Sequence, residues 1–185
     1  MKFVFGKQDM VTAARAQENC WLLGNGLGGF SSTTAAFSVT RNDHGILIAA
    51  RTAPNDRVNL VHRLSEKLIV GEKELFLSTQ DFADGRECED GYRHLSSFTV
   101  EYGPQWIYEA EGVQVQRRCA IADGSNTVAV CYRVENRTNQ PCTVTFLQTR
   151  STSNLILTLQ GNGSFPFPPR LSPPSRLHHI YESTQ

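Results

Sequence analysis

The residues best suited to recognition or chemistry lie in a glycine-rich segment near the N-terminus. Four glycines occur among the six residues of Gly24–Gly29. The first, second and fourth fit the G-x-G-x-x-G pattern of dinucleotide-binding loops, which requires a strand before the loop and a helix after it. The residues that follow are mostly hydroxyl-bearing or β-branched, and this disfavours a helix. The sequence therefore argues against a nucleotide site, and the glycines indicate unusual backbone angles or a close approach to the main chain.

An acidic loop at residues 81–91 is the second segment whose side chains could carry out chemistry. Glycoside hydrolysis needs two carboxyl groups, about 5–5.5 Å apart for retention and about 6.5–9.5 Å apart for inversion. Arg86 and Arg93 lie close enough in the sequence to pair with these acids, and the spacing of a calcium loop is absent. We therefore interpret this segment as a solvated charged loop. Its carboxylates are Asp81, Asp84, Glu87, Glu89 and Asp90.

The histidines and cysteines form no recognisable metal or nucleophile motif. The five cysteines are scattered without a C-x-x-C pair, and neither H-E-x-x-H nor G-x-S-x-G occurs. Zinc sites and serine hydrolases depend on such spacings. We expect no metal, no cofactor and free thiols that are buried or half-buried.

The charge balance excludes some classes of partner. Lysine plus arginine and aspartate plus glutamate both number 18, so the net charge is zero. A balanced chain has no electrostatic reason to bind nucleic acid or an anionic membrane, whereas a neutral polysaccharide suits it. The N-terminus lacks the apolar stretch of a signal peptide, and no apolar run is long enough to span a bilayer. We expect a cytoplasmic protein without nucleic-acid or membrane partners.

The elements that must position these residues are predicted to be strands. The length of 185 residues suits one ordinary domain, and no helix of normal length is predicted after residue 20. Alternation and turn residues predict hairpins of 67–70 with 74–77 and of 105–110 with 113–116, and a third pair of 127–134 with 142–147. Further short strands are expected at 45–50 and 58–61. Many short strands joined by turns favour an all-β antiparallel sandwich or barrel.

The C-terminal part differs in composition. Five of the eight prolines follow Ser151, and proline lacks the N–H that a central strand donates. A last strand is predicted at 155–159, followed by an extended tail. We therefore divide the chain into a sandwich at 1–150 and a proline-rich tail at 151–185, for which a role as a recognition ligand is an alternative.

Two longer motifs carry a family resemblance. Residues 21–30 are W-L-L-G-N-G-L-G-G-F, and residues 40–49 are T-R-N-D-H-G-I-L-I-A. Both motifs, and the spacing between them, resemble the opening of the N-terminal domain of bacterial and archaeal type glycogen debranching enzymes. The resemblance extends from about residue 18 to about residue 148.

This resemblance implies a galactose-mutarotase-like β-supersandwich that precedes an (α/α)₆ barrel. In the family the barrel carries the catalytic carboxylates of an amylo-α-1,6-glucosidase, which hydrolyses the branches of glycogen-like α-glucans. Nothing in this chain can form that barrel. We therefore expect a non-catalytic domain that supports the barrel and contacts glucan, and that is inactive alone. Since the likeness stops after residue 148, we expect a sandwich without its last strands and a truncated or frameshifted tail.

The resemblance places the two motifs in a loop at the domain junction or the glucan cleft. Arg41 and His44 either brace the glycine loop or face a glucan or the missing barrel. Trp21 is either a core residue or a platform for sugar stacking, whereas strand alternation places Trp106 in the core. The candidate residues are Trp21, Asn25, Gly26, Gly28, Gly29, Arg41, His44 and Gly45.

Two other functions stay open at this point. The first is a stand-alone module that binds α-glucan. The second is a sugar epimerase of the mutarotase type, which needs a histidine and a glutamate that face each other in one cleft. His62 and Glu66 are the candidates, and this hypothesis rests on fold analogy alone.

Overall fold

The computed structural model describes residues 2–52, 55–82, 88–149 and 154–160. Within them, strands dominate and one short α-helix, α1 (Ala13–Glu18), stands beside the 3₁₀ turns η1 (Lys7–Asp9) and η2 (Gly91–His94). The strands are β1 (Phe3–Gly6), β2 (Cys20–Gly24), β3 (Phe30–Thr34), β4 (Gly45–Thr52), β5 (Asp56–Val61), β6 (Arg63–Val70), β7 (Lys73–Phe76), β8 (Thr79–Gln80), β9 (Glu89–Asp90), β10 (Leu95–Val100), β11 (Pro104–Ala110), β12 (Val113–Ile121), β13 (Val128–Asn136), β14 (Cys142–Thr149) and β15 (Asn154–Gln160). The all-β prediction is confirmed.

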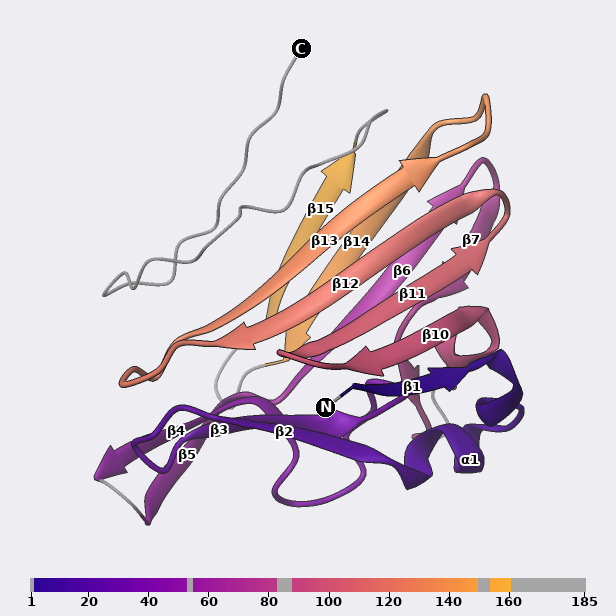
Figure 1. The fold of residues 1–185 in the computed structure, drawn as a ribbon. Helices are drawn as coiled ribbons and strands as arrows, with labels where there is room; N and C mark the ends of the chain where they lie inside the picture. The colour runs from indigo at the N-terminus through magenta and orange to yellow at the C-terminus, as the bar shows by residue number, and fades with distance from the viewer. Residues whose placement is uncertain (1, 53–54, 83–87, 150–153, 161–185) are drawn as a thin grey trace.

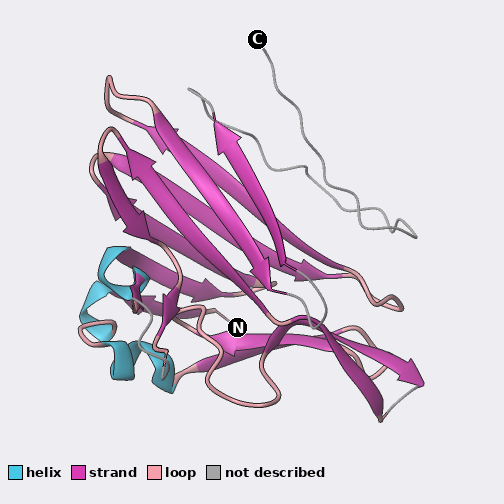
Figure 2. Cartoon of the chain, turned by 180° about the vertical axis from the view of Figure 1, so that it is seen from behind, coloured by secondary structure: helices cyan, strands magenta, loops and turns pink. Residues whose placement is uncertain are grey.

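Three larger antiparallel sheets and a two-stranded sheet of β8 and β9 make up the architecture of the described residues. The first sheet has the order β1-β10-β11-β12-β13, the second β15-β14-β6-β7 and the third β2-β3-β4-β5. Figure 1 shows the first two stacked face to face as a sandwich, with the third sheet running beneath them. The helical segments gather at one end of the molecule, beside the third sheet (Figure 2).

The β11–β12 hairpin shows how the sequence selects this fold. From Pro104 to Tyr108 and from Val113 to Cys119 every second residue is buried, as alternation of apolar and polar residues predicts. Glu111 and Gly112 both have positive φ, +48° and +74°, and Ala110 pairs with Val113. Two-residue hairpin loops of this kind match the twist of the flanking strands. The predicted hairpin is therefore confirmed, as is the hairpin of β6 with β7.

An aromatic cluster fills the core between the first and third sheets. Trp106 is fully buried, as predicted, and its indole N–H donates to the carbonyl of Ala35 at 2.7 Å. The rings of Trp21 and Phe37 meet Trp106 edge-on, with centroids 5.6 and 5.0 Å away. Such edge-to-face pairs add to the stabilisation from burial.

The predicted pairing of the strands around 127–134 and 142–147 is wrong. Both strands exist, but β13 pairs with β12 in the first sheet, whereas β14 pairs with β6 and β15 in the second. The five residues 137–141 that join them are long enough to cross between two layers about 10 Å apart. A tight two-residue turn would have kept both strands in one sheet.

The prediction of a last strand is confirmed, whereas the prediction about the cysteines is partly wrong. The last predicted strand is confirmed as β15, which extends the second sheet past residue 150, and the tail beyond residue 160 lies outside the described residues.

All five thiols are free, but the expectation that none is exposed is wrong. Cys20 on strand β2 and Cys88 in a loop are exposed, because neither lies under another layer of the structure.

Candidate functional site

The glycine loop joins β2 to β3 and is held by its own asparagine. The Asn25 backbone N–H donates to the carbonyl of Gly29 at 3.0 Å, and the Asn25 side-chain oxygen accepts from the Leu27 N–H at 2.9 Å. Gly26 and Gly28 have φ of +75° and +91°, where a side chain is strained. The unusual backbone angles that the glycines predicted are therefore present.

Gly29 is required for a different reason, the close approach of other groups. A Cβ on Gly29 would lie 2.6 Å from the side-chain nitrogen of Asn25, 2.8 Å from the side-chain oxygen of Asn126 and 3.0 Å from the carbonyl of Ile48. A Cβ on Gly24 would meet nothing within 4 Å. Gly26 and Gly28 are therefore required for their backbone angles and Gly29 for its small size, whereas Gly24 is replaceable.

Two asparagines lock this loop to a distant turn and to β4, and we call Asn25 and Asn126 with the backbone of Ala50 the amide clip. Asn25 is fully buried, and its amide donates to the side-chain oxygen of Asn126 at 2.9 Å. The Asn126 amide also accepts from the Ala50 N–H at 3.1 Å and donates to the Ala50 carbonyl at 2.7 Å. Because β3 begins at Phe30 opposite Ile48, no β3 residue lies beside Ala50, and Asn126 bonds to the Ala50 backbone there instead.

Apolar side chains are exposed next to the clip, and we call Leu22, Leu27 and Phe30 the outer patch. Leu22 is 64 % exposed and Leu27 is 39 % exposed. The register places Leu22 and half-buried Phe30 on the same face of the third sheet, in diagonal positions. The Arg57 guanidinium lies 5.4 Å from the Phe30 ring centre and donates to the carbonyl of Gly28 at 2.7 Å. The glycine loop, which the amide clip holds in place, therefore lies beside an exposed apolar face of the third sheet.

The second motif forms a turn that leads into β4. His44 is 2 % exposed, and its Nδ1 accepts from the Thr40 N–H at 3.2 Å. Burial lowers the pKa of His44, an effect that the nearby Asp43 carboxylate opposes. The neutral ring with its proton on Nε2 is the form that can accept from Thr40. The His44 backbone N–H donates to the carbonyl of Arg41, whose side chain is exposed.

The structure brings most of the candidate residues to one sheet but not to one surface. Gly45 needs its small size, since a Cβ there would lie 2.9 Å from the Asn59 side-chain oxygen. Ser32 pairs with Gly45 across β3 and β4, so the second motif adjoins the strand that follows the loop. Trp21 lies in the core with 5 % exposure, and its indole N–H donates to Thr33 at 3.0 Å. Its ring therefore presents no face to a sugar in this domain.

A charged cluster in the sandwich core escaped prediction, and we call Glu66, Arg117, Tyr108 and Tyr132 the ion-pair cluster. Glu66 and Arg117 are fully buried and paired, from β6 and β12. Arg117 also donates to the Tyr108 hydroxyl, and the Tyr132 hydroxyl donates to Glu66. Burial raises the pKa of Glu66, and the Arg117 charge opposes this rise. The one sequence signal was the inward position of Arg117 in the alternation of β12.

The guanidinium group of Arg117 is enclosed by aromatic rings. Its carbon lies 3.4 Å from the ring centre of Phe37 and 4.4 Å from that of Trp106. Cations over aromatic faces are attracted to the ring quadrupole, most strongly when water is excluded. The rings and Glu66 together compensate a charge that would otherwise be costly to bury.

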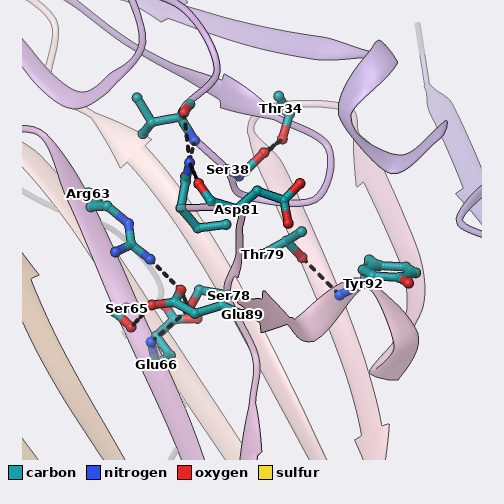
Figure 3. A network of polar contacts seen from close by, with 12 residues as sticks. Thr34, Ser38, Arg63, Ser65, Glu66, Ser78, Thr79, Asp81, Glu89 and Tyr92 are labelled. Carbon is teal, nitrogen blue, oxygen red and sulfur yellow. Dashed lines mark hydrogen bonds and ion pairs between the residues drawn. The ribbon is translucent and has the colours of Figure 1, made fainter. Parts of the chain in front are cut away.

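The acidic loop is not uniformly solvated, which corrects its interpretation from the sequence. Glu89 is buried and accepts from Arg63, from Ser65 at 2.6 Å and from Ser78 (Figure 3). Glu89 lies on β9, which pairs with β8, and Arg63 and Ser65 hold it against β6 of the second sheet. Asp90 and Arg93 form the expected exposed pair at 3.1 Å. Asp84 and Glu87 lie outside the described residues.

The two residues of the epimerase hypothesis are both engaged in other contacts. Both oxygens of Glu66 are bonded, and His62 contacts Asn59 at 3.1 Å through Nδ1. The epimerase hypothesis, which needs these two residues in one cleft, gains no support. Among the described residues, no group of three or more histidine, cysteine or acidic side chains is placed to hold a metal. No helix in the described part of the chain has the length and apolar character to cross a membrane.

Comparison with known proteins points to one family. A family model described as the glycogen debranching enzyme N-terminal domain matches residues 19–154. No curated protein and no solved structure matches the chain significantly. The matched segment includes the glycine loop, the amide clip and the turn before β4. It covers most of the chain, which therefore belongs to the glycogen debranching enzyme N-terminal family.

Proposed function

We propose that this chain is a non-catalytic domain of a glycogen debranching enzyme and supports a catalytic (α/α)₆ barrel that acts on α-1,6 branches. The observation that carries this proposal is the family match over residues 19–154, and the outer patch beside the amide clip is the candidate contact surface. Leu22 is 64 % exposed on a sheet face whose neighbouring loop is fixed by buried amides. A contiguous exposed apolar surface is typical of an interaction site, so we expect the barrel to dock at the outer patch.

The rigidity of the loop supports a docking role. Because Asn25 and Asn126 hold the loop before any partner arrives, little conformational freedom is lost when a surface binds there. The carboxylates in the sandwich support the absence of catalysis. Glu66 and Glu89 are buried and engaged by Arg117 and Arg63, so neither is free to act on a glycosidic bond.

The first test measures chemistry and glucan binding in the isolated chain. Incubation with glycogen or a branched limit dextrin is expected to release no glucose, and release above the buffer blank would overturn the non-catalytic role. Electrophoresis through a gel containing glycogen then separates two functions. Unchanged mobility supports a role in scaffolding alone, and retardation favours the stand-alone α-glucan-binding module.

The second test addresses docking. A catalytic barrel from a debranching enzyme of this family, expressed without its own N-terminal domain, is mixed with the chain. We expect the chain to increase the activity of the soluble barrel and Leu22→Asp to abolish this increase. Tyr102→Asp is the matched control, because Tyr102 is 96 % exposed and lies outside the outer patch. Equal behaviour of the two variants would count against docking through the outer patch.

A further inference from the structure

Asn25 is followed directly by Gly26 in the glycine loop, and this pair is open to a spontaneous covalent reaction. The Gly26 backbone nitrogen can attack the side-chain carbon Cγ of Asn25 and form a five-membered succinimide ring. The bond from Cγ to Nδ2 breaks, and ammonia leaves with the proton that Gly26 gives up. Water from the solvent then opens the ring to aspartate or isoaspartate. Glycine favours the attack, because it has no Cβ to hinder the approach.

The fold requires both residues of this pair. Gly26 has a φ of +75°, where a residue with a side chain is strained, and a Cβ there would lie 2.9 Å from the Asp123 side-chain oxygen. Asn25 provides the amide that bonds to Asn126. A less reactive residue at either position would therefore strain the backbone or remove the clip. Protection against the reaction has to come from the folded structure instead.

The amide clip supplies that protection. The Asn25 Nδ2 atom donates to the Ser125 carbonyl at 3.0 Å and to the Asn126 side-chain oxygen at 2.9 Å, and Oδ1 accepts from the Leu27 N–H. In the attack Cγ becomes tetrahedral, which moves both amide atoms away from these partners, so the reaction has to break bonds that stabilise the closed loop. The ring-opening step also needs water at a side chain that is fully buried.

The product does not fit the closed clip. A carboxylate at position 25 has no hydrogen to donate, so it would face two acceptors, the Ser125 carbonyl and the Asn126 side-chain oxygen. Turning the Asn126 amide to donate would break both of its bonds to the Ala50 backbone. Burial of an uncompensated charge is unfavourable, and isoaspartate would also lengthen the loop backbone by one methylene group.

We infer that Asn25 is a deamidation site that the amide clip protects, so that opening of the clip leads to an irreversible change from amide to acid. The reaction takes place in the fraction of molecules in which the loop has opened locally. Once the acid has formed, the clip cannot close again, and the glycine loop is released from the turn at Asn126. The inference rests on the contacts of the clip and does not depend on the proposed scaffold role.

The primary experiment follows deamidation of the full chain in mildly alkaline buffer by tryptic digestion and mass spectrometry. Fragmentation of the peptide of residues 16–41 separates a change at Asn25 from one at Asn19. We expect Asn25 in the folded wild type to react at least about tenfold more slowly than in the same chain unfolded in guanidinium, because only locally opened molecules react. Equal rates in the folded and unfolded chains would overturn the inference.

Two variants separate the clip from the general stability of the fold. Asn126→Ala removes one partner of the Asn25 amide and is expected to raise the rate at Asn25 about fivefold or more. Val144→Ala is the control, because it truncates a buried side chain on β14 of the second sheet and leaves the clip intact. Its rate at Asn25 should stay within about twofold of the wild type. A rate in Asn126→Ala no higher than that in Val144→Ala would overturn the protective role of the clip.

Asn25→Asp reproduces the aspartate product and tests whether the change is irreversible for the clip. Hydrogen exchange is expected to speed up at Ala50, whose N–H donates to Asn126. Asn19→Asp makes the same chemical change at an exposed position and should leave exchange at Ala50 unchanged. If Ala50 in Asn25→Asp exchanges as slowly as in the wild type, the clip accommodates the acid and the inference is wrong.

Discussion

The amide clip and the ion-pair cluster solve the same problem with different chemistry. Each joins sheets through buried polar groups. The clip uses neutral amides that bond to each other and to the backbone of Ala50. The cluster uses one carboxylate and one guanidinium in a cage of aromatic rings.

The difference shows which parts of the fold are restricted to particular residue types. At the clip, positive φ at Gly26 and Gly28 and the crowding at Gly29 leave few alternatives. At the cluster, the requirement is that charge be compensated, and a well-packed apolar set often serves equally well. We therefore expect the clip to tolerate few substitutions and the cluster to tolerate coordinated ones.

The largest effect should come from removing one member of the ion pair. Arg117→Met leaves Glu66 buried without its cation, and we expect a loss of about 3–5 kcal/mol in the free energy of unfolding. Urea unfolding followed by circular dichroism measures it. Arg118→Met is the matched control, because the next residue on β12 is exposed and its loss should cost at most about 0.5–1 kcal/mol. Equal losses of unfolding free energy in Arg117→Met and Arg118→Met would contradict a stabilising role of the buried Arg117 charge.

The double variant Arg117→Met with Glu66→Leu sharpens this result. Removing both charges should restore more than half of the stability lost in Arg117→Met, because no unpaired charge stays buried. The hydroxyls of Tyr108 and Tyr132 lose partners, so full recovery is not expected. If the losses of unfolding free energy in the two single variants simply add in the double variant, the two residues are not coupled. That result would contradict the role given to the ion-pair cluster.

Gly29→Ala tests the crowding at the loop. Because its Cβ would lie 2.6–3.0 Å from three atoms of the surroundings, we expect a loss of about 1–3 kcal/mol in unfolding free energy. Gly24→Ala, at the end of β2 just before the loop, has free space and should change the unfolding free energy by less than about 0.5 kcal/mol. The two midpoints in urea are compared directly. A small effect at Gly29 would indicate that the clip can shift to make room.

Asn126→Ala removes the clip while leaving the backbone angles unchanged. The side chains of Asn126 and Asn25 are bonded to each other and to main-chain groups, so we expect a loss of about 1–2 kcal/mol in unfolding free energy. Hydrogen exchange should also speed up at Ala50, whose amide is bonded to Asn126. Asn139→Ala, at an exposed position between β13 and β14, is the control. Unchanged exchange at Ala50 would contradict the role of the clip.

The smallest effect concerns pH. Burial lowers the pKa of His44, and also that of His62 and His94. An unfolded histidine titrates near pH 6.5, so below about that pH the unfolded state takes up protons that the folded state resists, and stability falls. His44→Asn keeps a short acceptor for Thr40 but removes one titrating group. We expect its urea midpoint to fall less than that of the wild type between pH about 7.5 and 5.5. An identical fall would show that the folded environment of His44 does not resist protonation.

The sequence predicted the parts of the fold that depend on local pattern. The alternation in β11 and β12 and the Glu111-Gly112 turn indicated that hairpin, and the glycine loop was visible because its backbone restricts residue type. The partner of the loop could not be predicted, since Asn126 stands among ordinary turn residues. The Glu66–Arg117 pair could not be predicted from the sequence either. Charges on two strands become partners only after the sheets are stacked, and alternation does not specify which sheet lies opposite.

The span of the amide clip has a consequence for how the chain folds during synthesis. Asn25 and Asn126 are 101 residues apart in the sequence. At typical translation rates of about 5–20 residues per second, roughly 5–20 s separate their synthesis. During that interval the glycine loop has no partner turn, and the third sheet is open at one end. The clip therefore cannot close until β12 has been synthesised, and it can close before β13 and β14 have been added to their sheets.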